Sequence, residues 1–154
     1  MDLNMLYAAL QGDDPAAAHP DFYLYFYRHP AMKQEPFVRA FLILSGWLGT
    51  SLRSGVWTFY EVTPVQDMLD AAGYFRENGA AEIAEMLQKG IHDYQDPKYQ
   101  ADFDYPAEWL REAEETDGWI NAHRTQIEQY LTDELRRNRQ IIEKYDPAGE
   151  SQRM

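Results

Sequence analysis

The chain has 154 residues, of which 45% are hydrophobic and 14% aromatic, and it carries a formal net charge of −12. The apolar and aromatic content is sufficient for a buried core, which excludes a wholly disordered acidic chain and predicts a single globular domain over residues 1–145, followed by a flexible tail at 146–154. The negative charge repels nucleic-acid phosphate, so we expect no direct nucleic-acid binding and a cation or a basic protein as the partner.

The sequence also indicates a cellular location. The chain has no cysteine, which excludes disulfide bonds and thiolate metal sites and is typical of a reducing compartment. The N-terminal residues lack the basic and apolar regions of a secretory signal, and the most apolar run, 40–50, is far shorter than the roughly 20 residues that span a membrane. We therefore expect a soluble, cytoplasmic protein that does not insert into a membrane.

Helical periodicity dominates the predicted elements, so the predicted fold class is mostly α, a compact multi-helix bundle. Residues 21–28 hold five aromatic side chains between two prolines, and we favour a helix there. From Phe37 to Leu48 apolar residues recur at i, i+3 and i+4, which predicts a largely buried helix.

An αα-hairpin is predicted over about 63–92. Its first helix runs to about Glu77, where Asn78-Gly79 is a typical stop signal. A second helix follows at once, because apolar residues from Ile83 to Ile91 repeat at helical spacing.

The periodicity weakens over 94–117, which we interpret as mostly loop with one short helix at 107–115. A long C-terminal helix is then predicted at about 118–145. Its apolar stripe either closes the core of a monomer or forms the seam of a homodimer, and we favour the homodimer. The stripe consists of Ile120, Ile127, Tyr130, Leu131, Leu135, Ile141 and Ile142.

Acidic residues are concentrated in one segment. Residues 93–117 hold nine carboxylates and only two bases, Lys98 and Arg111, so this segment carries a net charge of −7. The nine carboxylates are the candidate partner-binding residues: Asp93, Asp96, Asp102, Asp104, Glu108, Glu112, Glu114, Glu115 and Asp117.

Two interpretations of this segment remain open. It can be a solvated loop that its aromatic residues hold against the core. Alternatively, its carboxylates stand on a fixed scaffold and imitate phosphate groups, while aromatic residues at the rim provide anchor contacts for a basic partner. The aromatic residues concerned are Tyr94, Tyr99, Phe103, Tyr105 and Trp109.

Signatures of catalysis and metal binding are missing from the sequence. None of the four histidines stands in a spacing that places two metal ligands on one helical face. The loop that begins at Asp96 lacks the glycine and the final glutamate of a calcium-binding EF-hand. Carboxylate pairs such as Asp67 and Asp70 are typical of a solvated acidic surface. We therefore predict that the protein is not an enzyme and uses no metal or cofactor.

One family resemblance is present. The segment 54–60, which reads Ser-Gly-Val-Trp-Thr-Phe-Tyr, is followed by a helix, by a Gly-Ala helix start at Gly79, and by Asp117-Gly118-Trp119-Ile120. In this order the chain resembles the bacterial DNA-mimic-protein (DMP) C-terminal domain family over about residues 37–145. The matching turn comprises Ser54, Gly55, Trp57, Phe59 and Tyr60.

The resemblance implies a mostly α-helical domain without a cofactor. In the characterised member of that family, a dimer presents an acidic surface to the DNA-binding face of a transcription factor, while most members have no known function. A shared fold does not by itself determine function.

Three hypotheses of function follow. The first is a non-enzymatic DNA mimic that binds a basic DNA- or RNA-binding protein, such as a transcription factor, through the nine carboxylates. The second is an immunity protein that neutralises a basic nuclease toxin with the same surface. The third is a small-ligand or enzyme module in which Trp57 and Tyr60 line a pocket.

Overall fold

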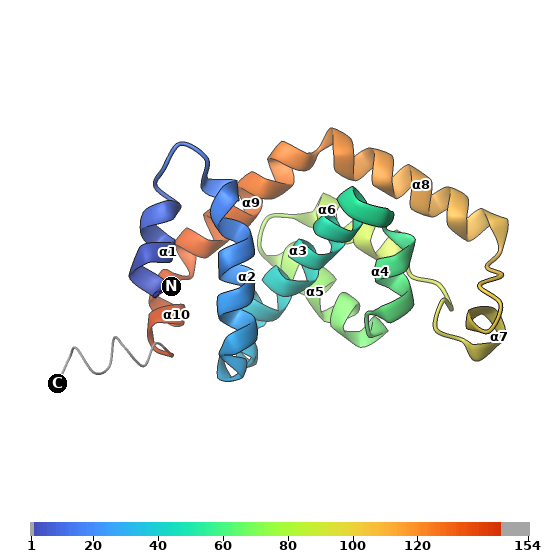
Figure 1. Cartoon of the computed structure of the whole chain (residues 1–154), viewed down its shortest axis with the longest axis horizontal. Coiled ribbons are helices and arrows are strands. Elements are labelled where there is room, and N and C mark those ends of the chain that lie inside the picture. The colour runs from blue at the N-terminus through green and yellow to red at the C-terminus, as the bar shows by residue number, and fades with distance from the viewer. Residues whose placement is uncertain (1, 146–154) are drawn as a thin grey trace. The chain divides into compact units, whose positions relative to one another are not determined.

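The computed structural model describes residues 2–145, and over this range the protein is mostly α-helical, without a strand (Figure 1). The predicted fold class is confirmed. The predicted tail, 146–154, lies outside the described residues. None of the helices described is both long and apolar enough to cross a membrane.

The chain divides into two compact units. Unit 1 combines the residues up to Leu42 with those from Thr125 onward, and unit 2 comprises Ile43–Arg124. The single domain expected from the sequence stays a prediction, and each unit is described by itself.

Unit 1 brings the two ends of the described chain together. The Tyr7 hydroxyl donates to the Leu135 carbonyl oxygen at 2.8 Å, and the Arg136 guanidinium donates to the Leu10 carbonyl oxygen at 2.8 Å. These contacts hold the first helix beside the last ones, as Figure 1 shows. The elements of this unit are α1 (Leu3–Ala9), η1 (Pro15–Ala18), α2 (His19–Arg28), η2 (Pro30–Gln34), the first part of α3 (Pro36–Ser54), α9 (Arg124–Arg137) from Thr125, and α10 (Arg139–Glu143).

Aromatic rings fill the core of unit 1. Phe26 is fully buried and lies edge-on to Phe41, with ring centroids 5.4 Å apart, and Phe22 lies edge-on to Tyr7 at 5.0 Å. Edge-to-face pairs of this kind add about 0.5–1.5 kcal/mol beyond area burial. The helix predicted at 21–28 is confirmed, since α2 spans His19–Arg28. Its aromatic residues supply much of this core.

Unit 2 contains the predicted αα-hairpin, formed by α5 (Val65–Glu77) and α6 (Ala81–Lys89). Gly79 adopts a φ of +81°, a left-handed conformation that glycine accepts without steric cost, and the Ala80 N–H donates to the Phe75 carbonyl oxygen at 2.8 Å. The stop signal read from the sequence is therefore correct. The other elements are the rest of α3, α4 (Trp57–Val62), α7 (Pro97–Gln100) and α8 (Ala107–Ala122).

The long C-terminal helix requires a correction. Residues 118–145 are mostly helical, but α8 already begins at Ala107, and breaks at His123 and Asn138 separate α8, α9 and α10. The prediction used Gly118 as a boundary, whereas this glycine lies inside α8. Burial of Thr116 and Ile120 along α8 outweighs the roughly 1 kcal/mol that a glycine costs within a helix.

The apolar stripe of this region is largely part of the protein's own core. Five of its seven side chains are buried in the single chain, and the other two are half-buried. The stripe therefore gives no support to a dimer seam, and the homodimer stays a prediction. The buried members are Ile120, Ile127, Leu131, Leu135 and Ile142.

Tyr60 connects the elements of unit 2. Its hydroxyl donates to the Leu87 carbonyl oxygen at 2.7 Å and accepts from Trp47 Nε1 at 3.0 Å. Burial raises the pKa of the Tyr60 hydroxyl well above its usual range, a shift that the hydrogen bond from Trp47 only partly opposes. Gly90 lies so close that a Cβ placed on it would be 2.3 Å from Tyr60 Cζ. The ring thus has partners on several sides and no room to move.

Replacing Gly90 by alanine is expected to lower the free energy of unfolding by about 1–3 kcal/mol, the usual cost of overpacking a core. The added methyl group would displace the Tyr60 ring and strain both hydrogen bonds of its hydroxyl. Gly73→Ala is the matched control, because a Cβ at this position in α5 meets nothing within 4 Å. It should raise stability by up to about 1 kcal/mol. Urea denaturation followed by circular dichroism measures both effects, and an unchanged stability of Gly90→Ala would contradict the packing described.

His19 is a buried titratable group in unit 1. Its Nε2 lies 2.8 Å from Thr132 Oγ1, and its ring lies edge-on to Phe41. Burial lowers the pKa of the imidazole, although the charges of Glu128 and Asp14 act in the opposite direction. His19 also opens α2, where the helix dipole disfavours a cation. The folded state therefore favours neutral His19.

We expect stability to fall as the pH drops below about 6.5, because the unfolded chain then binds a proton on His19 that the folded state binds less tightly. This contribution is fully present above the unfolded pKa. In the variant His19→Gln, the loss of unfolding free energy between pH 7.5 and 5.0 should be smaller, by at most about 1.4 kcal/mol per pH unit. Urea denaturation at several pH values tests this, and equal slopes for the two proteins would show that His19 does not titrate as described.

Candidate partner-binding site

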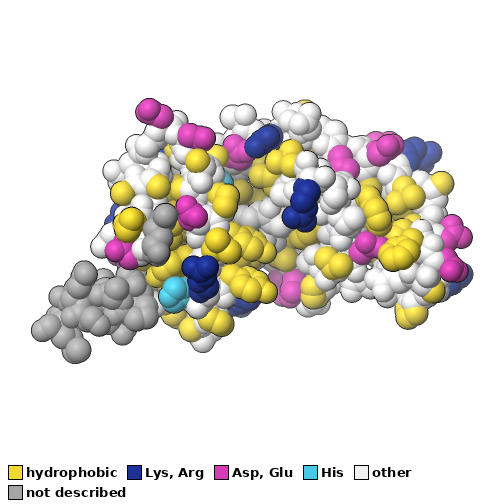
Figure 2. All heavy atoms as spheres, viewed as in Figure 1, with side chains coloured by type: hydrophobic (Ala, Val, Ile, Leu, Met, Phe, Trp, Pro, Cys, Tyr) yellow, Lys and Arg dark blue, Asp and Glu magenta, His cyan; other side chains and the backbone are white. Residues whose placement is uncertain are grey.

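Seven of the nine predicted carboxylates are exposed, and all nine belong to the segment that leads through α7 into α8. Figure 2 shows acidic side chains near α7 and the N-terminal half of α8, next to hydrophobic ones. We call the seven exposed residues the acidic surface. They are Asp93, Asp96, Asp102, Asp104, Glu108, Glu114 and Glu115.

The remaining two carboxylates, Glu112 and Asp117, are half-buried and make internal contacts. Glu112 Oε2 lies 2.6 Å from His92 Nε2, and the His92 ring stacks on Trp109 with centroids 4.9 Å apart. Glu112 therefore binds within the protein and contributes less to an outward-facing charge than the seven exposed residues.

Asp117 joins α8 to the turn between α3 and α4. Its Oδ1 accepts from the Ser51 hydroxyl at 2.5 Å and from the Val56 N–H at 2.9 Å. The turn itself depends on Gly55, whose φ of +97° is unfavourable for any residue with a Cβ. Asp117 thus satisfies the backbone N–H of Val56, which is buried just before α4 begins.

The five residues of the family-motif turn have different surroundings. Phe59 and Tyr60 are buried, Trp57 and Gly55 are half-buried, and Ser54 is exposed. The turn and Asp117, which the resemblance treats as separate parts of one pattern, are in contact through the hydrogen bond to Val56.

Glutamine side chains attach the acidic segment to the end of α4. Gln95 Nε2 donates to the carbonyl oxygens of Tyr60 at 3.2 Å and Thr63 at 2.5 Å, and Gln100 Nε2 donates to that of Glu61 at 3.3 Å. The last carbonyl groups of a helix have no partner within the helix itself. The acidic segment provides the missing donors, so its backbone position is coupled to α4.

Aromatic packing links the same segment to α4, where Tyr94 stacks on Tyr60 with ring centroids 6.0 Å apart and Tyr105 lies 6.1 Å from Trp57. Tyr94 and Tyr105 are buried with ring centroids 5.0 Å apart, and Tyr99 lies edge-on to Trp109 at 5.0 Å. These four rings pack on one another within the segment, and the contacts with Tyr60 and Trp57 hold it against the core, as the first interpretation of the sequence expected. Phe103 differs, because 68% of it is exposed.

The hydroxyl groups of the buried tyrosines stay protonated near neutral pH. Burial, followed by the charges of Glu112 and Glu61, raises the pKa of Tyr94 to about 12. Burial, together with the hydrogen bond that Tyr105 donates to the Glu61 carboxylate, raises the pKa of Tyr105 to about 12. Neither phenol adds charge to the acidic surface.

Few cations oppose this surface. Lys98 makes a cation–π contact with Tyr99, its Nζ lying 5.3 Å from the ring centroid. Lys89 approaches Glu115 at 3.7 Å, an exposed pair that contributes at most about 1 kcal/mol. Within the part of the chain that the structure describes, the other six carboxylates of the acidic surface form no ion pair.

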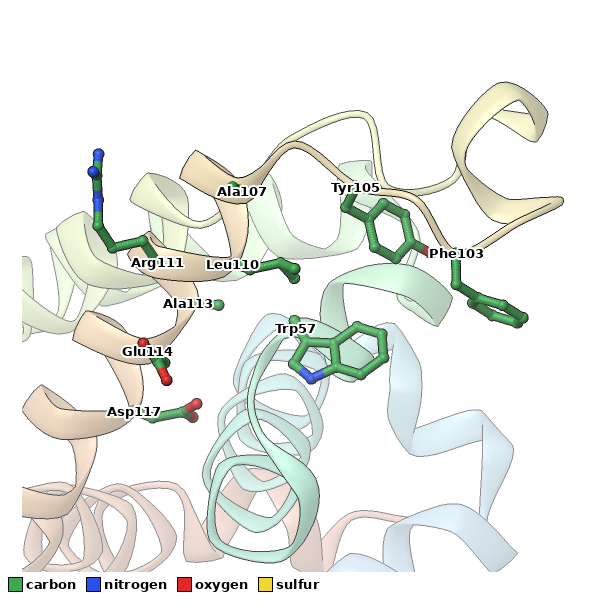
Figure 3. A pocket seen from close by; sticks show the side chains of 9 residues that line it. All are labelled: Trp57, Phe103, Tyr105, Ala107, Leu110, Arg111, Ala113, Glu114 and Asp117. Atoms are coloured by element: carbon green, nitrogen blue, oxygen red, sulfur yellow. The ribbon is translucent and has the colours of Figure 1, made fainter.

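A pocket of about 570 Å³ opens between α4, the acidic segment and α8 (Figure 3). Trp57, Phe103, Tyr105 and Leu110 provide apolar and aromatic walls, while Glu114 and Asp117 lie on the α8 side. The remaining lining residues are Ala107, Arg111 and Ala113.

This pocket differs from the one that the third hypothesis expected. Trp57 lines it, but Tyr60 does not, because the Tyr60 hydroxyl is bound within the core. Across residues 2–145, no group of three or more histidine or acidic side chains is arranged to hold a metal ion.

Comparison with protein-family models, with curated proteins and with solved structures finds no match to this chain. The resemblance to the DNA-mimic-protein family stays a prediction.

The α8 side of the pocket was not predicted from the sequence. Ala107, Leu110, Arg111 and Glu114 recur at i, i+3, i+4 and i+7, the spacing of one helical face. The helix predicted at 107–115 contains all four residues, so their common face could be predicted, but nothing in the local sequence indicates that Trp57 lies at the same pocket. The contacts of Asp117 with Ser51 and Val56 had no signal, since 61 and 66 residues separate the partners.

Replacing Asp117 by alanine is expected to lower the free energy of unfolding by about 2–3 kcal/mol, because a buried Val56 N–H then loses a charged acceptor. Asp117→Asn keeps one acceptor oxygen and should lose less. The control is Glu114→Gln on the exposed side of the same helix, which should change stability by no more than about 0.5 kcal/mol. Chemical denaturation measures all three variants, and equal stabilities of Asp117→Ala and Glu114→Gln would exclude the anchoring role.

Proposed function

We propose that this is a non-enzymatic interaction protein whose acidic surface binds a basic protein in the place of nucleic-acid phosphate. One observation carries the proposal: seven carboxylates are exposed on a segment that internal hydrogen bonds and buried aromatic rings attach to the helical scaffold.

The attachment matters because mimicry of phosphate depends on the position of each charge. A flexible acidic loop would lose conformational entropy on binding, whereas an ordered segment avoids much of this cost. Gln95 and Gln100 bind the end of α4, and Tyr94 and Tyr105, which belong to the segment, are buried. The scaffold is therefore suited to present charges in one arrangement.

The charge of the surface is also largely uncompensated. Six of its seven carboxylates form no ion pair among the described residues, so their field extends into solvent. A field of this kind accelerates association with a basic partner and is screened by salt. Electrostatic complementarity between surfaces then supports specificity and a high association rate.

Two classes of basic partner fit this surface. A transcription factor is the partner that the family resemblance implies, and a nuclease toxin is the partner of an immunity protein. Both would be met in the cytoplasm, the location proposed for this protein. The two classes differ in what the bound protein loses, which is operator binding in one case and nuclease activity in the other.

Neutralising the acidic surface is expected to abolish partner binding. The test variant changes Asp93, Asp96, Asp102 and Asp104 to asparagine and Glu108, Glu114 and Glu115 to glutamine. Asparagine at 96 retains the capping of α7, where Asp96 Oδ1 accepts from the Lys98 N–H at 2.9 Å. The wild-type chain, immobilised and exposed to lysate of its source organism, should retain a basic protein that moderate salt releases, and the variant should not retain it.

The control variant removes the same number of exposed carboxylates elsewhere, so that both proteins have a net charge of −5 instead of −12. The residues are Asp13, Asp21, Asp67, Asp70, Glu77, Glu82 and Glu85, all exposed. The retained protein, once identified and purified, should lose DNA binding or nuclease activity when the wild-type chain or the control variant is added. Equal binding by both variants would reject the acidic surface as the site.

A further inference from the structure

The pocket beside the acidic surface combines aromatic walls with carboxylates. Trp57, Phe103 and Tyr105 provide aromatic surface, and Glu114 and Asp117 provide carboxylates on the opposite side (Figure 3). Its volume of about 570 Å³ lies within the range of roughly 300–1,000 Å³ that is usual for small-ligand sites. The pocket therefore has room for a long side chain and accompanying water.

The charge of the pocket selects a cation. Glu114 is exposed and forms no ion pair among residues 2–145, and Asp117 accepts the hydrogen bonds from Ser51 and Val56 with Oδ1. Arg111 lines the pocket, but its guanidinium points away from it (Figure 3). An anionic ligand would meet two carboxylates, and a wholly apolar one would desolvate them without replacing their hydrogen bonds.

We infer that this pocket accepts an arginine side chain of the basic protein partner. A guanidinium group is planar, so it can stack on an aromatic face while it donates two hydrogen bonds to one carboxylate. Its apolar stem can pack against Leu110, as long cationic side chains commonly do on apolar surface. Lysine lacks the planar fork and fits this combination less well.

The position of the pocket connects its occupant to the acidic surface. Phe103 lies between Asp102 and Asp104 in the chain, and Glu114 belongs both to the pocket and to the acidic surface. Phe103 also has a φ of +51°, which is uncommon for a residue with a bulky side chain. The exposed Phe103 ring thus lies at the pocket, next to carboxylates that attract a basic protein.

The inference rests on the proposed function, since the arginine is supplied by a basic partner. Binding at the pocket can be distinguished from binding at the acidic surface with two labelled eight-residue peptides of equal charge, one of arginine and one of lysine. Attraction to the acidic surface should be similar for both peptides, whereas the pocket should favour arginine. We expect the full chain to bind the arginine peptide about three- to tenfold more tightly, because only a guanidinium can stack flat on an aromatic ring while it donates two hydrogen bonds to one carboxylate.

Substitutions in the pocket test whether it causes this preference for the arginine peptide. Trp57→Leu and Glu114→Gln should each bring the affinity for the arginine peptide close to that for the lysine peptide, whereas Trp57→Phe should keep most of the difference. Glu115→Gln is the matched control for Glu114→Gln, because it removes the same charge from the same helix outside the pocket. It should lower the affinity for both peptides equally.

A direct measurement on the wild-type chain covers the case in which Trp57→Leu does not fold. In a ¹H–¹⁵N correlation spectrum, the indole signal of Trp57, assigned with Trp57→Phe, should shift on addition of the arginine peptide and much less with the lysine peptide. If both peptides bind with equal affinity and leave this signal in place, the pocket inference is overturned while the acidic surface still stands. If neither peptide binds, the proposed function fails together with it.

Discussion

The buried hydroxyl of Tyr60 is the constraint on which unit 2 depends. A phenol inside a core must keep a hydrogen-bond partner, and here the Leu87 carbonyl accepts its proton while the Trp47 indole donates to it. These bonds connect α3, α4 and α6 through one side chain. The ring leaves no space for a Cβ at position 90, and its neighbour Tyr94 lies in the segment that carries the carboxylates. The packing around Tyr60 therefore also helps to position the segment that carries the acidic surface.

Acidic residues have two distinct roles along the same helix. Asp117 and Glu112 are half-buried and bind Val56, Ser51 and His92, so they act as structural acceptors. The exposed carboxylates around them have few partners and carry the outward charge. Solvation explains the difference, since a carboxylate is stable in water without a partner but requires donors when it is partly buried.

The pocket adds specificity to a surface that would otherwise recognise only charge. Exposed carboxylates attract any basic protein, and this attraction weakens with salt. An aromatic wall beside a carboxylate responds in addition to the shape of the cation, because stacking and paired hydrogen bonds require a planar group. Trp57 and Glu114 together therefore provide a means of distinguishing among basic partners.

Local chemistry along the chain was enough to predict the helical fold, the αα-hairpin with its stop at Gly79, and the segment in which the carboxylates gather. Each of these depends on neighbours a few residues apart, through helical periodicity, backbone conformation or charge. Tertiary structure alone decided that α8 continues through Gly118, that Asp117 bonds to residues more than 60 positions away, and that Trp57 faces Glu114 across a pocket. The reason is physical: burial against distant segments outweighs the small local preference of a glycine or an aspartate, and a pocket exists only where such segments meet.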